Sequence, residues 1–165
     1  MARRHGGGGT PATVALDAVG VRYVLHAYEH DPAAASYGME AAEALGVEPG
    51  RVFKTLLVDL EGGPGGCAVG IVPVDRQLDL KAIAAALGAK RAGMAEPRAA
   101  ERLTGYVVGG ISPIGQKRRL PTVLDDAAAA HETVLVSGGR RGLDLELAPE
   151  DLLAVTGGVL ATIAR

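Results

Sequence analysis

The chain has 165 residues and a formal net charge of −2, a length that predicts one domain with a full hydrophobic core. A charge so close to neutral excludes strong sequence-independent binding to nucleic acid, so any RNA contact must use local basic patches. The single cysteine, Cys67, excludes an internal disulfide framework and a cysteine-based zinc site. No stretch is apolar enough to span a bilayer, and the first residues lack a signal-peptide core. We therefore expect a cytoplasmic protein that does not enter a membrane.

The first half of the chain predicts a tail followed by compact elements. Residues 1–9 are polar and glycine-rich, and we expect a disordered tail, with residues 10–165 forming the single domain. Thr10 and Pro11 are typical of a helix start, and Gly20 of a helix end. The pattern then predicts a strand over 22–28, a loop over 29–36, a helix over 38–45, a strand over 51–60, a tight turn over 61–66 and a strand over 67–74.

The second half alternates short helices with short apolar segments. It predicts a helix over 79–87, a strand over 90–94, a helix over 96–103, a strand over 106–108, a second apolar segment over 121–124 and a helical turn over 126–131. Strands over 133–137 and 143–147 follow, joined by a basic turn, and a helix opens at Pro149. These elements indicate the α+β class, with a curled, barrel-like sheet of mixed but largely antiparallel strands and short helices packed around it.

The stretch 105–125 carries the first candidate chemistry. Paired glycines, Gly109 and Gly110, let the backbone turn tightly and let another molecule approach it closely. Backbone N–H groups in such a loop can bind negative oxygens, and the basic run Lys117, Arg118 and Arg119 suits a phosphate-bearing partner. The alternative is a glycine-rich connection with a solvated basic rim.

Four further side chains each allow two interpretations. Lys54 lies within an otherwise apolar strand, so it must face a cleft, a carboxylate or solvent. Cys67 has no histidine arranged beside it in sequence, which favours a semi-exposed strand residue over a nucleophile. His26 and His30 are four apart but flank a strand end, so that spacing does not bring them to one face, and surface histidines are favoured over a metal pair.

Four motifs occur in an order that resembles the YbaK/EbsC family. They are residues 28–32 (YEHDP), 52–57 (VFKTLL), 109–117 (GGISPIGQK) and 136–144 (VSGGRRGLD). The likeness covers the chain from about residue 14 onward. It implies the fold of the editing domain inserted in some prolyl-tRNA synthetases, and hydrolysis of the ester between a wrong amino acid and the 3′ end of tRNA. The family includes free-standing bacterial enzymes that remove cysteine mischarged on tRNA(Pro).

The resemblance also implies the site. Lys54 matches the key lysine of the family and Gly109 its key loop glycine. The positions that line the substrate pocket are Tyr28, Tyr37, Thr55, Gly110, Ser137 and Asp144; close relatives carry Phe at position 37. Our candidates for tRNA contact are Lys117, Arg118, Arg119, Arg140 and Arg141. We expect no cofactor and no metal. The expected partners are the 3′ end of mischarged tRNA(Pro) and prolyl-tRNA synthetase.

The expected mechanism needs no nucleophile from the protein. The family is thought to let the thiol of the substrate attack its own carbonyl, while the protein supplies positioning and an oxyanion site. If that cyclisation holds, the enzyme would be classed as a lyase rather than a hydrolase. Open alternatives are the same fold with another specificity, such as Ala-tRNA(Pro), and a non-catalytic module that binds a tRNA end or the synthetase. A regulatory thiol protein would rest on Cys67 alone.

Overall fold

The computed structural model describes residues 9–63 and 65–165, so most of the expected tail lies outside the described residues. In chain order the elements are α1 (Pro11–Val19), β1 (Val24–Ala27), α2 (Tyr37–Leu45), the 3₁₀ turn η1 (Pro49–Arg51), β2 (Phe53–Glu61), β3 (Cys67–Pro73), α3 (Leu80–Ala86), β4 (Arg91–Met94), α4 (Pro97–Thr104), β5 (Thr122–Asp125), the 3₁₀ helix η2 (Asp126–Ala130), β6 (Val134–Arg140), β7 (Leu143–Leu147), α5 (Pro149–Thr156) and β8 (Val159–Ala161). Within these ranges no helix is long and apolar enough to cross a bilayer.

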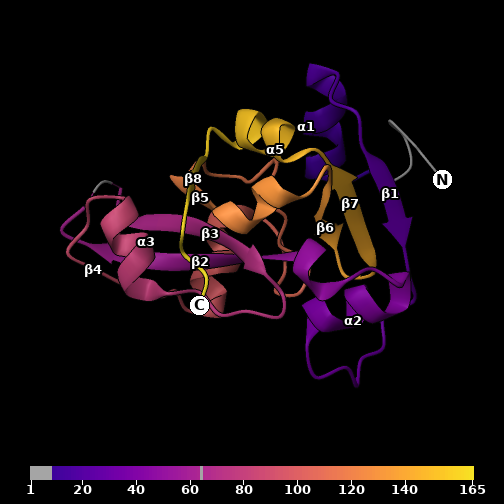
Figure 1. Cartoon of the computed structure of the whole chain (residues 1–165), viewed down its shortest axis with the longest axis horizontal. Coiled ribbons are helices and arrows are strands. Elements are labelled where there is room, and N and C mark those ends of the chain that lie inside the picture. The colour runs from indigo at the N-terminus through magenta and orange to yellow at the C-terminus, as the bar shows by residue number, and fades with distance from the viewer. Residues whose placement is uncertain (1–8, 64) are drawn as a thin grey trace.

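The strands form two sheets, and both contribute side chains to the core. One sheet has the order β1-β7-β6, and the other has the order β4-β2-β3-β5-β8. The pairs β1–β7, β6–β7, β2–β3 and β2–β4 are antiparallel, whereas β3–β5 and β5–β8 are parallel. Figure 1 shows the smaller sheet standing beside one end of the larger one, with α2 below it and α1 above. The predicted α+β class with a mixed, largely antiparallel sheet is confirmed, and the sheets do not close into a true barrel.

The helix ends follow the local chemistry that the sequence indicates. Thr10 caps α1 by accepting a hydrogen bond from the Thr13 amide, while the Thr13 hydroxyl accepts one from the Thr10 amide. Gly20 ends that helix in the left-handed conformation, with φ of 72°. The Thr10 hydroxyl also donates to the carbonyl of Gly138 at 2.6 Å, which ties the start of α1 to β6.

The largest core cluster lies where the two sheets meet. It combines Phe53 and Ile71 from the larger sheet with Val136 and Leu145 from the smaller one, and it includes Leu16 of α1. All five side chains are buried. The two sheets therefore share one core. The candidate functional site described below lies along the junction of the two sheets.

One predicted strand is absent. Residues 106–108 form bends and turns rather than a strand, although their apolar sequence indicated one. The Tyr106 amide donates to the Thr104 hydroxyl at 3.2 Å, and the Val108 amide donates to a carboxylate oxygen of Glu101 at 2.8 Å. Side-chain and loop contacts therefore take the hydrogen-bonding groups that a strand would offer to a neighbour.

Candidate functional site

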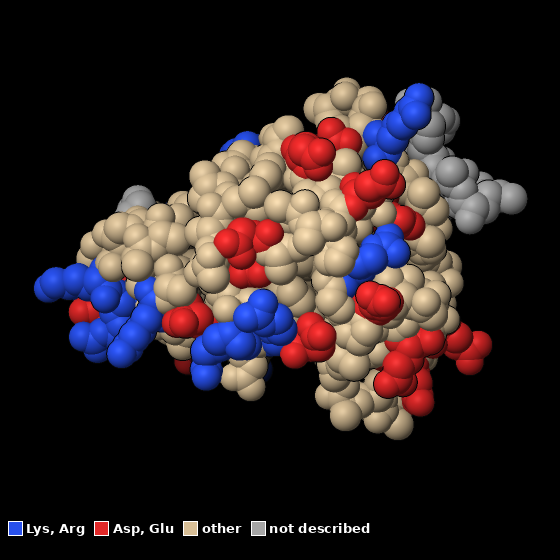
Figure 2. Space-filling model, viewed as in Figure 1, with Lys and Arg blue, Asp and Glu red and all other residues tan. Residues whose placement is uncertain are grey.

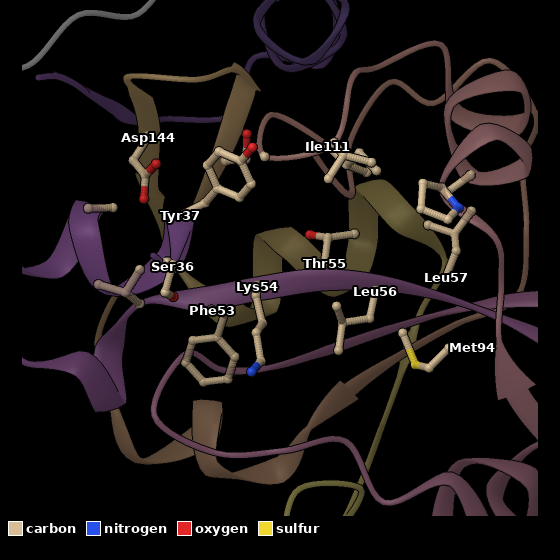
Figure 3. A pocket seen from close by; sticks show the side chains of 18 of the residues that line it. Ser36, Tyr37, Phe53, Lys54, Thr55, Leu56, Leu57, Met94, Ile111 and Asp144 are labelled. Carbon is tan, nitrogen blue, oxygen red and sulfur yellow. The ribbon is translucent and has the colours of Figure 1, made fainter. Parts of the chain in front are cut away.

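A cavity of about 380 Å³ lies between the N-terminal half of β2, the start of α2, the end of β4, α4 and the smaller sheet. Most of its lining is apolar, and the two charged side chains in the lining are Lys54 and Asp144. Figure 3 shows these groups around the space, with Asp144 and Tyr37 on one side and Met94 on the other. The lining residues are Tyr28, Ala35, Ser36, Tyr37, Gly38, Ala41, Val52, Phe53, Lys54, Thr55, Leu56, Leu57, Met94, Ala95, Pro97, Ala100, Val108, Gly109, Ile111, Ser137 and Asp144.

Regular β-structure builds one side of the cavity, which we call the strand wall (residues 53–57 of β2). β2 pairs with β3 from Phe53 to Asp59, but it pairs with β4 only from Val58 onward. The segment before Val58 therefore borders the cavity instead of another strand. Alternation along the strand sends successive side chains to opposite faces, and Figure 3 shows Thr55 pointing toward Tyr37 and Ile111 while Lys54 points toward Phe53.

Both polar side chains of the strand wall lack an ordinary partner. The hydroxyl oxygen of Thr55 is buried and makes no hydrogen bond to any described residue. Burial lowers the pKa of the Lys54 ammonium, and the charge of Asp75 partly offsets that effect. No ion pair of Lys54 occurs among the described residues. A half-buried ammonium without a close anion is costly, so the strand wall is suited to a ligand that brings negative charge.

The smaller sheet contributes a carboxyl group. Asp144 lies on β7 opposite Ser137 of β6, and only 6% of it is exposed. Burial raises the pKa of the Asp144 carboxyl to about 7, so burial favours the neutral acid over the carboxylate. The pKa of the nearby Tyr28 phenol is raised to about 12, first by burial and then by the charge of Asp144. Tyr28 therefore stays a neutral hydroxyl beside this carboxyl.

Opposite the strand wall is a surface made by the 107–110 turn and the first residue of α2, which we call the loop wall (Tyr37, Val108 and Gly109). Gly110 donates its amide to the carbonyl of Val107 at 2.8 Å, which closes a turn over residues 107–110. Gly109 has φ of +89°, a value typical of the third position of a type II turn. A Cβ on Gly109 would lie 2.7 Å from the Tyr37 ring. The missing side chain is what lets the turn touch the ring.

The two paired glycines have different surroundings. Gly109 lines the cavity, and its amide has no acceptor among the described residues. Gly110 is buried and does not line the cavity. A Cβ there would lie 2.7 Å from the Cα of Arg140. Gly110 thus packs the turn against the β6–β7 connection, so of the two amides only that of Gly109 is free to meet a ligand.

The five cations proposed for tRNA contact separate into two groups. Arg141 reaches the loop wall: its Nε donates to the carbonyl of Val108 at 2.9 Å, and its guanidinium lies 5.1 Å from the centre of the Tyr37 ring. The exposed run Lys117, Arg118 and Arg119 lies outside the cavity lining, with the amides of Lys117 and Arg118 bonded to carbonyls at the end of α4. Arg140 is exposed and also stands outside the lining.

The surface charge is mixed on the face shown in Figure 2. Acidic groups gather beside α2, basic groups gather over the ends of α3 and β4, and both signs alternate between them. This pattern agrees with the near-neutral net charge and offers no broad basic surface on this face. Contacts to a polyanion on this side would be local.

Cys67 and the described histidines do not line the cavity, although the ring centre of His30 lies 5.8 Å from that of Tyr37. The Cys67 thiol donates to Asp59 at 3.6 Å, and burial together with the Asp59 charge raises its pKa. His26 Nε2 lies 2.7 Å from a carboxylate oxygen of Glu146, and His30 Nδ1 lies 2.8 Å from one of Glu40. Within the described part of the chain, no three His, Cys, Asp or Glu side chains gather as a metal site would require.

The cavity brings together most of the residues that the motifs singled out. Tyr28, Tyr37, Lys54, Thr55, Gly109, Ser137 and Asp144 all line it. Sequence reasoning missed the wall contributed by Met94, Ala95, Pro97 and Ala100, whose residue types carry no chemical signal. It also missed Glu101 and Arg141 as hydrogen-bond partners of the 107–110 turn, because only the fold brings these segments together.

Comparison with known proteins assigns this chain to a family. Residues 31–155 match the family described as the aminoacyl-tRNA editing domain. Of the curated relatives, a protein of Enterococcus faecalis named as a candidate Cys-tRNA(Pro)/Cys-tRNA(Cys) deacylase, EbsC, is 44% identical over 122 residues, which cover 74% of this chain and 73% of the relative.

Two other comparisons bear on specificity and fold. The multifunctional Ser/Thr-tRNA deacylase ProXp-y of Escherichia coli K12 is 33% identical over 85 residues, about half of each chain (51%). A crystal structure described as a candidate trans-editing enzyme for prolyl tRNA synthetase superposes with a TM-score of 0.78 at 28% identity, over 94% of this chain and 95% of the other.

Proposed function

Since this chain belongs to the aminoacyl-tRNA editing domain family, we propose that it is a deacylase that removes cysteine mischarged on tRNA(Pro). The observation that carries the proposal is the cavity itself. It is small, mostly apolar and lined by one cation and one buried carboxyl, which suits the end of an aminoacyl-tRNA with its phosphates, its ammonium group and a small side chain.

Lys54 and Asp144 would bind opposite charges of the substrate. The Lys54 ammonium would pair with the terminal phosphate or hydrogen-bond the ribose, which compensates its unfavourable burial. The Asp144 carboxyl would accept hydrogen bonds from the α-ammonium of the aminoacyl group. An adjacent cation favours the ionised carboxylate, so binding would lower the raised pKa of Asp144.

The thiol of the substrate would act as the nucleophile. Its sulfur attacks the ester carbonyl, a C–S bond forms and the C–O bond to the 3′ oxygen breaks. The 3′ oxygen leaves with a proton, and water then opens the thiolactone to release free cysteine. The Gly109 amide would donate to the carbonyl oxygen as negative charge develops on it. No cysteine or histidine lies in the described lining, which fits a site that positions rather than attacks.

Specificity is the finer part of the proposal. A small pocket distinguishes side chains that differ by one group by only about 10- to 200-fold, whereas a mechanism that needs the thiol rejects alanine outright. The kinship with ProXp-y makes a hydroxyl-bearing acyl group a second candidate, because a hydroxyl could attack or bind where the thiol does. An Ala-tRNA(Pro) deacylase would have to use water instead.

The test is release of labelled amino acid from tRNA(Pro) by the purified protein. Cysteine, serine, alanine and proline esters are compared, with and without prolyl-tRNA synthetase, the partner expected in the cytoplasm. We expect fast release of cysteine and slow release of the other three. Equal release of serine or alanine would overturn the specificity, and release of none would overturn the activity.

A further inference from the structure

Arg141 contacts two segments that are distant from it in sequence. The 107–110 turn follows α4, Tyr37 opens α2, and Arg141 lies in the connection between β6 and β7. The guanidinium of Arg141 contacts both of the others: Nε donates to the Val108 carbonyl at 2.9 Å, and the group lies over the Tyr37 ring at 5.1 Å. A planar guanidinium forms both contacts from one rigid group, with N–H donors in its plane and a flat face toward the ring, a geometry that the compact ammonium of Lys does not reproduce.

The bonded carbonyl belongs to the same peptide unit as the Gly109 amide. That unit is planar and trans, so its C=O and N–H point in opposite directions. It is also the central peptide of the turn, the one whose rotation converts a type II turn into a type I turn. A hydrogen bond from Arg141 to the Val108 carbonyl therefore fixes the direction in which the Gly109 N–H points. The charge at the carbonyl also polarises the peptide and strengthens its N–H as a donor.

We propose that Arg141 is a positioning residue that locks the central peptide of the 107–110 turn, so that the Gly109 amide faces the reacting carbonyl. The Tyr37 ring lies against both the guanidinium and Gly109, and these contacts hold Arg141 and the turn together. This role rests on the proposed deacylation for its kinetic consequences, but its structural consequence does not depend on any activity. It replaces, for Arg141 alone, the role of tRNA contact expected from the basic sequence.

A tRNA contact and a peptide lock predict different behaviour. A phosphate contact depends on charge, so Lys would replace Arg, and the loss in Ala would be in KM and would depend on salt. A lock depends on the guanidinium, so Lys and Ala would fail alike. The loss would then be in kcat, on the order of tenfold for one charge-assisted hydrogen bond.

The experiment measures kcat and KM of wild type, Arg141→Lys, Arg141→Ala and the control Arg91→Ala on two substrates. One is full-length Cys-tRNA(Pro), and the other is cysteinyl-adenosine, which has no phosphate. Arg91 is exposed, in a long 3.8 Å ion pair on β4, and its loss tests the effect of charge alone. In parallel, nitrogen-edited NMR records the Gly109 amide shift and its hydrogen exchange in each variant.

Both Arg141 variants should have a lower kcat on both substrates, while KM and its salt dependence stay unchanged. The Gly109 amide resonance should shift in both variants. Wild-type kinetics in Arg141→Lys would overturn the proposal, as would a loss confined to KM on tRNA. An unmoved Gly109 resonance would also overturn it. If the wild type deacylates neither substrate, the proposed function fails, and the Gly109 resonance alone decides the role of Arg141.

Discussion

The strand wall and the loop wall face each other across the same cavity, but different contacts hold them. The strand wall is one segment of β2, fixed by backbone hydrogen bonds to β3. The loop wall depends on single side chains: Glu101 and Arg141 hold the Val108 residue, and Gly109 meets the ring of Tyr37. A partly exposed side chain of the strand wall, such as that of Lys54, can therefore change with little effect on the fold, whereas a change in the loop wall alters its shape.

The largest effect is expected at the strand wall. Lys54→Ala should reduce kcat/KM by about 10³-fold, because the variant removes the charge that would meet the substrate phosphate or ribose. Its melting temperature should not fall, since Lys54 forms no ion pair with a described residue and its burial is unfavourable. Steady-state kinetics with calorimetry check both points, with Lys81→Ala, an exposed lysine of α3, as the control. Near-wild-type turnover would contradict this role.

A smaller loss, with a structural signature, is expected at the loop wall. Gly109→Ala places a Cβ 2.7 Å from the Tyr37 ring at a φ of +89°, so both the ring and the turn must move. If the variant loses its oxyanion donor, kcat should fall on the order of 10²- to 10³-fold. Gly93→Ala on β4, where a Cβ meets nothing within 4 Å, is the matched control. An unchanged kcat would show that Gly109 does not approach the ester.

The buried carboxyl of Asp144, on the smaller sheet, links activity to stability. The pKa of Asp144 is raised from 3.8 to about 7, so as the pH rises the unfolded chain ionises first. The stability that the protonated carboxyl provides is therefore complete below about pH 4 and is lost as the pH rises through about 7. Asp144→Asn cannot ionise and should lack this loss.

Two measurements test the proposed binding role of Asp144 and its raised pKa. Its replacement by Asn should lower kcat/KM by about tenfold to a hundredfold, because the α-ammonium loses a charged acceptor. Melting temperatures of the two proteins should be closest in acid, and Asp144→Asn should be the more stable at alkaline pH. Parallel stability curves across the range would show that the Asp144 carboxyl is not shifted.

The smallest effect is expected far from both walls. Neutralising Arg118 and Arg119 together should raise KM for tRNA by less than about tenfold. The slope of log KM against log salt concentration should become shallower by about one for each phosphate that the variant no longer neutralises. The kcat should stay the same, because neither side chain lines the cavity. Kinetics across a salt series check this, with Arg91→Ala as the control. An unaltered slope would favour a solvated basic rim.

The two walls also differ in how far sequence alone predicts them. β2 follows from its apolar run. The resemblance singled out Lys54 and Gly109 as key residues, and both line the cavity, while their roles stay predictions. The contacts of Arg141 have no local pattern, because Val108 is 33 positions away and its partner is a backbone carbonyl. Residues 106–108 predicted a strand because an apolar run indicates a buried segment. Tyr106 is indeed buried, but the segment that holds it is a bend rather than a strand.

In the proposed reaction, the protein positions a substrate whose own thiol does the chemistry. Cys67 is the alternative thiol, but it lies outside the cavity lining and its pKa is raised by burial and by Asp59. The most direct measurement pairs Cys67→Ser on Cys-tRNA(Pro) with wild type on S-methyl-cysteinyl-tRNA(Pro). We predict full activity in the first case and no release in the second. A dead Cys67→Ser together with cleavage of the methylated substrate would mean that the nucleophile belongs to the protein.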